Sequence, residues 1–341
     1  ESTNRIIKLS SNETPLGASS KVVNILKNYS FNTYRYPDGS SVELRESLAK
    51  KHGIDKDKII CGNGSDEVLS LLAHCFAGPE DEVIYSEHGF LVYPIAVRAA
   101  GAIPVPAPEK NLRADVTSIL SLSTEKTKLC YIANPNNPTG TYLSTNELIT
   151  LRQGLPEKCI LVIDSAYAEY VDESDYSDGI NLVNKYNNIA CTRTFSKIYG
   201  LAALRIGWMY ASKDIVEYIN RIRLPFNTNS IAQMAAIEAL KDNKFIKDAK
   251  KHNDIWKPWT EKKLEEYGIR TIPGVANFIL AKFDDEMQAN SCLQFLEKQG
   301  ILIRGIKEYG LPEYLRITVG LEEENKVMCK EIQNFLNQYE K

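Results

Sequence analysis

A cluster of hydroxyl, amine and guanidinium groups follows an apolar stretch in the second half of the chain. The run Ile189–Thr192 is apolar and partly β-branched, which predicts a buried strand. Thr194, Ser196 and Lys197 come just after it, and Arg205 stands further on, before a second apolar run. Hydroxyls and an arginine fork suit a phosphate, and a lysine amine can form a Schiff base with a carbonyl. The pattern indicates a site for a phosphorylated carbonyl compound, although a lone Ser-Lys pair would more often be a polar loop.

A glycine-rich turn between a predicted strand and a predicted helix offers a second phosphate contact. Gly64 lets the backbone approach a ligand, and Ser65 or Asp66 can cap the helix that follows. Free N–H groups at such a helix start bind phosphate, whereas the plain alternative is an ordinary capped turn. Glu67 holds the place of the third glycine of G-x-G-x-x-G, which disfavours a nicotinamide site.

Two further motifs follow predicted strands. The segment Asn134–Gly140 contains two prolines and must be a rigid loop rather than a helix or a central strand. Asp164 and Tyr167 follow the apolar run Ile160–Ile163. Open α/β sheets bind ligands at the carboxyl ends of their strands. There Asp164 could keep a pyridine nitrogen protonated and Tyr167 could donate to a phenolate oxygen, while the common alternative for the aspartate is a helix N-cap.

Three other residues carry weaker signals. Phe90 follows the predicted strand Glu82–Tyr85 and could stack on a ring, although an aromatic residue there is more often part of the core. Arg304 and Arg316 lie in or after apolar strands near the C-terminus. An arginine among apolar neighbours needs an anionic partner, which is either a structural carboxylate or a substrate anion.

The elements that position these residues alternate as strand and helix. This order predicts a largely parallel sheet with helices on both faces. A long helical region follows, over 231–267, with a break expected near Pro258. A smaller α/β unit then comprises a strand at 277–282, a helix at 286–299, strands at 301–304 and 315–319, and a helix at 322–339. We expect an N-terminal arm (1–30) that joins the small domain, a large domain (31–245) and a small domain (246–341).

Composition narrows the class of partner and the compartment. The chain has 341 residues, with 41 Lys and Arg against 44 Asp and Glu, and this balance argues against a dedicated nucleic-acid or membrane surface. No apolar run reaches spanning length, and the first residues are polar, so neither an anchor nor a signal peptide is expected. The seven cysteines form no C-x-x-C pair, which favours reduced thiols in a cytoplasmic protein. The four histidines lack metal-ligand spacing, so no metal site is expected.

Together the motifs resemble the pyridoxal-phosphate (PLP) aminotransferases of fold-type I. Asn-Pro-x-x-Pro-Thr-Gly, Asp-x-x-Tyr and Thr-x-Ser-Lys with a later arginine recur in the order and spacing of that family. Asn12-Glu13, Arg35-Tyr36-Pro37 and the segment Leu315–Gly320 narrow the match to the histidinol-phosphate branch. The resemblance covers almost the whole chain. It implies a large domain with a mostly parallel central sheet flanked by helices, and a smaller α/β domain.

The resemblance also implies a role for each candidate at the cofactor. Lys197 would hold pyridoxal 5'-phosphate as a Schiff base and then act as general base and acid. Asp164 would pair with the ring nitrogen, Asn137 and Tyr167 would contact the ring hydroxyl oxygen, and Phe90 would stack on the ring. The phosphate would be held by the remaining set: Gly64, Ser65, Asp66, Thr194, Ser196 and Arg205.

Substrate and subunit contacts follow from the same resemblance. Arg316 would take the anionic end of the substrate, with Arg304 nearby and Asn12 as a further contact. Tyr36 would reach the cofactor phosphate of a neighbouring subunit in a homodimer with shared active sites. The sequence departs from the family where His88-Gly89 replaces a common Pro-Thr pair, which is expected to alter the pocket wall.

The implied reaction moves an amino group between histidinol phosphate and 2-oxoglutarate or glutamate, a step of histidine biosynthesis. The partners would thus be a small-molecule amino donor and a 2-oxo acid. An aromatic or broad-specificity aminotransferase is the first alternative, and a PLP-dependent phospho-amino-acid decarboxylase is the second. A PLP-binding transcription regulator would need a DNA-binding segment, and no such segment is visible.

Overall fold

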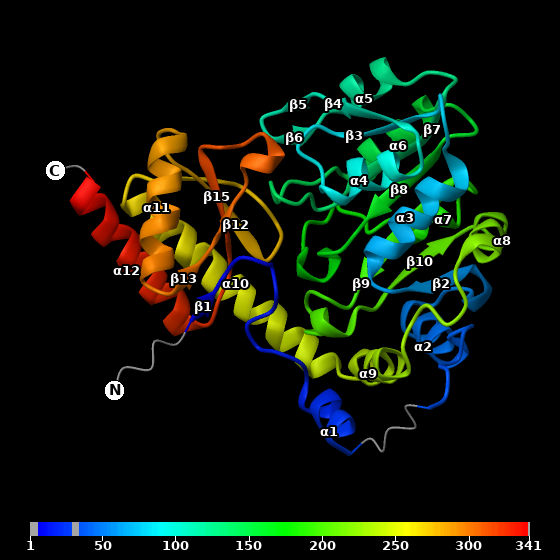
Figure 1. Ribbon diagram of the computed structural model, residues 1–341, viewed down its shortest axis with the longest axis horizontal. Coiled ribbons are helices and arrows are strands. Elements are labelled where there is room, and N and C mark those ends of the chain that lie inside the picture. The colour runs from blue at the N-terminus through cyan, green and yellow to red at the C-terminus, as the bar shows by residue number, and fades with distance from the viewer. Residues whose placement is uncertain (1–5, 29–33, 340–341) are drawn as a thin grey trace.

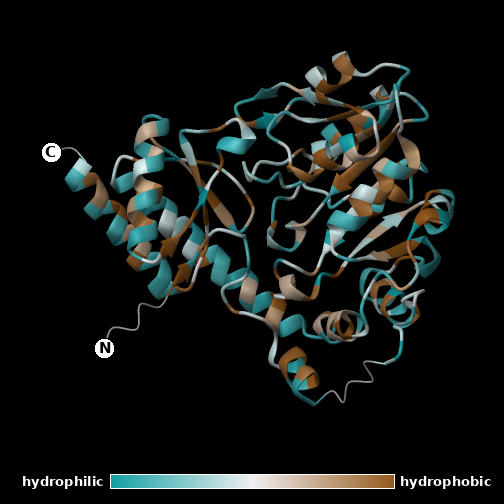
Figure 2. Ribbon diagram, viewed as in Figure 1, coloured by the Kyte–Doolittle hydropathy of each residue, from teal (hydrophilic) through white to brown (hydrophobic). Residues whose placement is uncertain are grey.

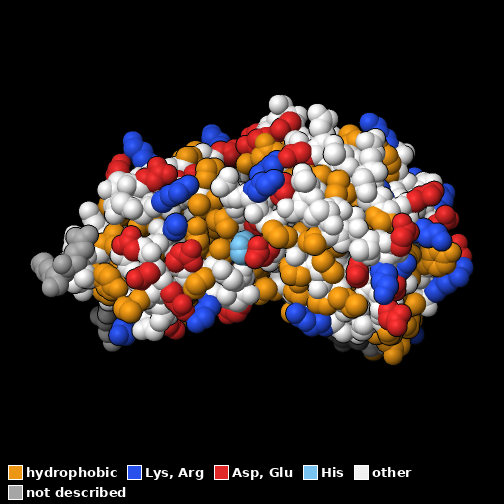
Figure 3. Space-filling model, turned by 90° about the horizontal axis from the view of Figure 1, so that it is seen from above, with side chains coloured by type: hydrophobic (Ala, Val, Ile, Leu, Met, Phe, Trp, Pro, Cys, Tyr) orange, Lys and Arg blue, Asp and Glu red, His pale blue; other side chains and the backbone are white. Residues whose placement is uncertain are grey.

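The computed structural model describes residues 6–28 and 34–339. The chain forms a larger lobe and a smaller lobe, and the strand nearest the N-terminus lies beside the smaller, C-terminal lobe (Figure 1). Residues 1–5 and 29–33, which belong to the predicted arm and the start of the large domain, lie outside the described residues. Side chains of both charge signs are interspersed over the face in Figure 3. No helix in the described ranges is long and apolar enough to cross a membrane.

A seven-stranded sheet forms the centre of the larger lobe, in the order β2-β10-β9-β8-β7-β3-β4. Its strands are β2 (Ile59–Gly62), β3 (Glu82–Ser86), β4 (Ile103–Ala107), β7 (Thr127–Ala133), β8 (Ile160–Asp164), β9 (Ile189–Thr194) and β10 (Gly207–Ala211). Six of these strands run in the same direction, and β10 runs in the opposite direction between β2 and β9. The prediction of a mostly parallel sheet is confirmed, and β7, β8 and β9 end at the same edge.

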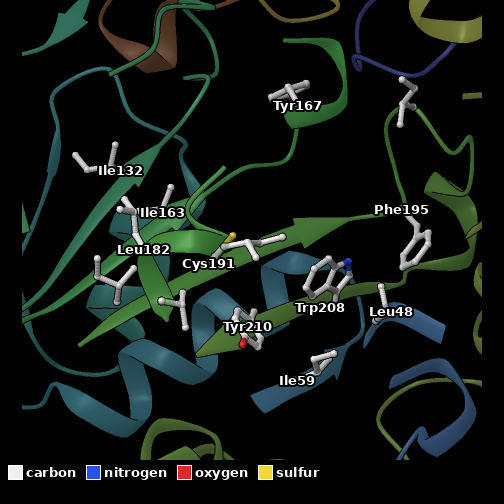
Figure 4. Packing of buried hydrophobic residues seen from close by; sticks show 14 of the residues in the cluster. Leu48, Ile59, Ile132, Ile163, Tyr167, Leu182, Cys191, Phe195, Trp208 and Tyr210 are labelled. Atoms are coloured by element: carbon white, nitrogen blue, oxygen red, sulfur yellow. The ribbon is translucent and has the colours of Figure 1, made fainter. Parts of the chain in front are cut away.

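Both faces of this sheet are covered by helices, because successive strand side chains point to opposite sides. Ala190 packs into one apolar cluster and Cys191 into the other. The Ala190 face carries α3 (Ser65–Phe76), α4 (Val92–Ala99) and α8 (Lys213–Ile222). The Cys191 face carries α2 (Val42–His52), α5 (Val116–Leu122), α6 (Thr145–Gly154), α7 (Ile180–Val183) and α9 (Ser230–Leu240). Figure 4 shows Cys191 with Ile163 and Tyr210 in the second cluster, and Figure 2 shows the brown, apolar strands between the helices.

The expected break near Pro258 was wrong. Helix α10 (Asn243–Glu266) runs through Pro258, and the interruption falls instead between α9 and α10, where the Asp242 side chain accepts from the Phe245 N–H. A proline inside a helix removes one backbone hydrogen bond. Thr260 and Leu264, which follow it, are buried, and α10 packs along the last helix, α12 (Glu322–Tyr339), and on the small sheet. This packing outweighs the local cost.

The smaller lobe contains an antiparallel sheet in the order β11-β12-β15-β14, and α10, α11 and α12 pack against it. Its elements are β11 (Arg270–Ile272), β12 (Phe278–Lys282), α11 (Glu286–Lys298), β14 (Arg304–Gly305), the short helix η4 (Lys307–Tyr309) and β15 (Tyr314–Thr318). The single strand expected at 301–304 divides at Ile303. Its first half, β13 (Ile301–Leu302), pairs with β1 (Ile7–Lys8), and its second half pairs with β15.

The arm therefore adds a strand to the smaller lobe before it crosses to the larger one. Leu9 is buried in the apolar core of the smaller lobe, whereas α1 (Ser20–Asn28) packs on α9 of the larger lobe. We propose on this ground that the chain consists of an arm (1–30), a large domain (31–245) and a small domain (246–341). The remaining short elements are η1 (Lys56–Lys58), β5 (Glu109–Lys110), β6 (Arg113–Ala114), η2 (Ala168–Tyr170) and η3 (Ala202–Leu204).

Candidate active site

A cavity lies at the carboxyl edge of the central sheet, where the segments after β7, β8 and β9 meet the start of α3 and the arm. Its lining residues are Ser11, Glu13, Ser65, Asp66, Phe90, Ala133, Pro135, Asn137, Asp164, Ala166, Tyr167, Thr194, Ser196, Lys197, Ala202 and Arg205. Nine of the residues predicted for the cofactor from separate motifs, together with Lys197, thus share one cavity. Ser11 and Glu13 of the arm were not predicted to line it.

Lys197 follows β9 and points into this cavity. Its Nζ lies 3.3 Å from the Ser11 carbonyl oxygen and 5.6 Å from the centre of the Tyr167 ring. Burial, helped by the nearby charge of Arg316, lowers the pKa of Lys197 to about 8. More of this amine is therefore neutral near neutral pH than in an ordinary lysine, and the neutral amine is the form that attacks a carbonyl.

Asp164 is a buried carboxylate with both oxygens in hydrogen bonds. The Tyr93 hydroxyl donates to Oδ2 and the Thr192 hydroxyl donates to Oδ1, each at 2.9 Å. Burial raises the pKa of Asp164 to about 6. The helix-cap alternative was wrong, because the next helical turn, η2, begins only at Ala168. Tyr93 was missed as a partner; the signal was a tyrosine on an apolar helix face, whose buried hydroxyl needs an acceptor.

Arg205 and the start of α3 form another part of the cavity wall, to which Arg205 brings a positive charge. Arg205 donates to the Ser196 hydroxyl at 3.3 Å and to Asp66 Oδ2 at 3.1 Å. Gly64 precedes α3 with a φ of 81°, and a Cβ there would lie 2.6 Å from Arg205 Nη2, so only glycine fits. The Thr194 hydroxyl accepts from the Ser196 N–H at 3.1 Å. Hydroxyls, a guanidinium and a helix N-terminus are together a suitable set of donors for a phosphate.

Arg316 lies behind the cavity wall as a buried cation with neutral partners. It donates to Asn137 Oδ1 at 2.5 Å and to the Ser10 carbonyl at 2.8 Å, and its Nε has no hydrogen-bond partner. None of the ion pairs found among residues 6–28 and 34–339 includes it. Burial lowers the pKa of Arg316. A buried guanidinium without a carboxylate is well placed to receive an anionic ligand.

Asn12 is not among the residues that line the cavity. It is almost fully buried, donates to the Tyr167 hydroxyl at 2.9 Å, and receives a hydrogen bond on its carbonyl from Asn277. The structure thus places Asn12 as a link between the arm and Tyr167.

Arg304 and Tyr36 lie outside the cavity. Arg304 is the cross-strand partner of Arg316, so both side chains leave the same face of the sheet. However, its guanidinium lies 3.9 Å from Glu308 Oε2 in a separate hollow beside α11. Tyr36 is 81% exposed and stacks on Phe226 with ring centres 4.5 Å apart.

A buried ion-pair group that the sequence analysis missed fixes the segment between Asp164 and β9. Arg193 of β9 donates to Asp178 and to Glu169, both at 2.6 Å, and its side chain is 5% exposed. Glu169 lies two residues after Tyr167, so this group holds the chain that carries the candidate phenol. The three charges lie far apart in sequence, which left no local signal.

Comparisons with known proteins agree with this geometry. Residues 4–332 match the model of the family described as aminotransferase class I and II. A histidinol-phosphate aminotransferase of Rhodopseudomonas palustris (strain BisB18) is 47% identical over 336 residues, which cover 98% of this chain and 92% of the relative. A histidinol-phosphate aminotransferase of Paramagnetospirillum magneticum is 45% identical over 338 residues, which cover 98% of this chain and 93% of the relative. A solved histidinol-phosphate aminotransferase of Sinorhizobium meliloti, in complex with pyridoxal-5'-phosphate, superposes with a TM-score of 0.92, at 25% identity over 98% of this chain and 91% of that one.

Proposed function

We propose, from the premise that this chain belongs to the class I and II aminotransferase family, that it moves an amino group between histidinol phosphate and 2-oxoglutarate or glutamate. The family membership makes it a transaminase, and the reaction is a step of histidine biosynthesis. The observation that carries the proposal is the single cavity that unites Lys197, Asp164 and Arg205. The substrate is supported by relatives 45–47% identical over nearly the full chain.

The cavity fits pyridoxal 5'-phosphate, which we propose as the cofactor. Arg205, Ser196 and the start of α3 suit its phosphate. Asp164 lies in the same cavity as a buried carboxylate that needs a cationic partner, as a protonated ring nitrogen would be. Lys197 offers an amine of lowered pKa for its carbonyl, and Tyr167 and Asn137 offer hydrogen bonds for its ring oxygen. Phe90 supplies an aromatic face in the wall.

The cofactor, when bound, supplies an electron-withdrawing ring that stabilises negative charge on the substrate α-carbon. Asp164 would support this by keeping the ring nitrogen protonated, because a buried carboxylate is stabilised by a cation that faces it. Lys197 would take the proton from the substrate α-carbon and deliver it to the C4′ carbon of the cofactor, and in the other half-reaction it would move a proton in the opposite direction. Arg316 would orient the substrate through its anionic end, because the partners of its two outer nitrogens are neutral and leave its charge uncompensated.

A panel of amino donors tests the proposal. Histidinol phosphate, glutamate, an aromatic amino acid and a phosphorylated amino acid are each mixed with the holoenzyme, and the cofactor absorbance is followed in a single turnover. Histidinol phosphate and glutamate should convert the cofactor fastest. A preference for the aromatic donor would support the broad-specificity aminotransferase instead, and release of carbon dioxide would support the decarboxylase.

We also propose a homodimer with shared active sites. Tyr36, Leu224 and Phe226 are apolar or aromatic side chains exposed by 81%, 72% and 44%, and such a group is costly to leave in water. A second copy of the chain would cover it.

All seven cysteines are free thiols, and six of them are buried, which supports our expectation of a cytoplasmic protein.

Mixing two inactive variants tests the shared site. If Tyr36→Ala is inactive alone, combining it with Lys197→Ala should restore part of the activity. One of the two sites in a mixed dimer would then contain both intact residues, since Tyr36 comes from the neighbour. Activity is measured after subunit exchange has been verified with differently tagged chains. Exchange without any recovery would contradict the composite site.

Arg304→Gln tests whether a second arginine helps to recognise the substrate phosphate. We expect this variant to bind histidinol phosphate about tenfold more weakly, while binding of glutamate and of an aromatic amino acid changes little. The reason is that a phosphate offers more charge and more oxygens than one carboxylate. The contact with Glu308 at 3.9 Å is weak enough to allow the side chain to turn. Half-reactions are compared at fixed salt. Equal changes for all three donors would assign Arg304 to the surface pair with Glu308.

A further inference from the structure

His88 forms a contact between the two lobes. Its Nδ1 lies 2.7 Å from the carbonyl oxygen of Tyr309, in η4 of the smaller lobe. A carbonyl oxygen can only accept, so Nδ1 carries the proton in this bond. The imidazole therefore donates across the boundary between the lobes.

The backbone of His88 is held on the larger lobe from two sides. Its N–H donates to Glu109 Oε1 at 3.1 Å, and its carbonyl oxygen accepts from Asn136 Nδ2 at 3.1 Å. Gly89 closes the turn with an N–H bond to the Ser86 carbonyl at 2.7 Å, where a Cβ would come within 2.8 Å of that oxygen. The direction of the imidazole is thus set by the loop that follows β3.

Tyr309 connects this imidazole to the buried cation. Its side chain is 8% exposed in an apolar cluster of the smaller lobe, against which Leu91 of the larger lobe packs. The Tyr309 side chain also interacts with the Arg316 guanidinium, and this interaction opposes the lowering of the Arg316 pKa by burial. Arg316 in turn donates to Asn137, the neighbour of Asn136. The contacts form a closed ring that returns to His88.

We propose that His88 is a positioning residue for the anionic end of the substrate, because its imidazole holds the Tyr309 carbonyl of the smaller lobe while its own carbonyl holds Asn136, next to the Asn137 that accepts from Arg316. The inference rests on the proposed function in assigning Arg316 to the substrate anion. Arg316 has only neutral partners on its two outer nitrogens, so no buried carboxylate orients it. Its orientation depends on this ring of contacts, in which the bond of His88 to the Tyr309 carbonyl and the bond of Arg316 to Asn137 both join the two lobes.

The test uses the holoenzyme and succinate, a dicarboxylate without an amine or a ketone, as a probe that binds without reacting. Succinate affinity is measured by calorimetry for the parent, His88→Ala and His88→Asn, and KM and kcat are measured with glutamate. We expect His88→Ala to weaken the binding of succinate and to raise KM for glutamate, each by roughly tenfold. Its kcat should stay within about twofold of the parent value. His88→Asn should recover part of the loss, because its amide N–H can still donate to a carbonyl.

His74→Ala is the matched control. His74 Nδ1 also bonds a carbonyl oxygen, that of Ser70 at 2.8 Å, but on the exposed side of α3. This variant should bind succinate like the parent. Arg316→Gln should lose more affinity than either variant of His88.

Several outcomes would overturn the inference. These are unchanged succinate affinity in a folded His88→Ala with full cofactor content, an equal loss in His74→Ala, or no recovery in His88→Asn. If His88→Ala does not fold, the comparison of His88→Asn with His88→Gln decides in its place, and unchanged affinity in both contradicts the proposal. Failure of the proposed substrate gives a different result: the parent would bind succinate and convert glutamate, yet leave histidinol phosphate unreacted. Unchanged succinate affinity in Arg316→Gln would remove both the anion site and the role of His88.

Discussion

Lys197→Ala is expected to lose roughly ten-thousandfold in transamination rate while the protein still folds and binds cofactor. The amine is the basic group at the centre of the cavity, and its pKa of about 8 lets it take and return a proton near neutral pH. The phosphate contacts from Arg205 and Ser196 do not depend on it. Single-turnover absorbance with glutamate measures the loss.

A covalent label identifies the same residue independently. Borohydride reduction of the parent holoenzyme should tether the cofactor mass to the peptide containing Lys197, as found by mass spectrometry. Lys213→Ala is the control, because Lys213 is 62% exposed and only pairs with Asp55 at 3.4 Å. That variant should keep parental activity and labelling. A tethered mass on a different lysine would refute the assignment.

Asp164→Asn is expected to slow transfer of the substrate α-proton by a few hundredfold, about 3 kcal/mol of barrier. Asparagine keeps the shape and can still bond to Tyr93 and Thr192, but it lacks the charge that keeps the ring nitrogen protonated. Exchange of the α-hydrogen of glutamate with deuterium measures this step directly. Asp175→Asn, which changes a carboxylate bonded to Tyr142 on the surface, is the control. An unchanged exchange rate would show that the charge of Asp164 is not used.

The same variant should change the pH dependence of stability in the ligand-free protein. Burial raises the pKa of Asp164 from 3.8 to about 6, so the folded state holds this proton more tightly than the unfolded state does. The free energy of unfolding should therefore fall as pH rises from about 4 to about 6, by up to about 3 kcal/mol from this group. Urea denaturation of the ligand-free parent and Asp164→Asn at several pH values measures the difference. Parallel profiles would contradict it.

Much of the cofactor end of the site was predictable from local sequence. A glycine before α3, prolines after β7, and hydroxyls with a lysine after β9 each have a local physical reason, namely backbone freedom, rigidity or hydrogen-bonding capacity. The strand-helix alternation predicted a mostly parallel sheet, and parallel neighbours end at one edge. These two inferences together were enough to predict that Asp164 and Lys197 face the same cavity.

Other features depend on contacts between residues far apart in the chain, and the tertiary structure alone decided them. Pro258 was expected to break a helix, but packing outweighed its local cost. Arg304 and Arg316 look alike in sequence, yet one reaches a surface glutamate and the other is buried beside Asn137.

The same holds for the partners of the buried groups. Neither the Tyr93 bond to Asp164 nor the bond between His88 and Tyr309 had a signal in sequence spacing. Local sequence determines what a backbone segment can adopt and what chemistry a side chain can perform. Which partner a buried charge or hydroxyl finds is determined by the packing of distant elements, because an unpaired polar group in the interior is costly wherever it lies.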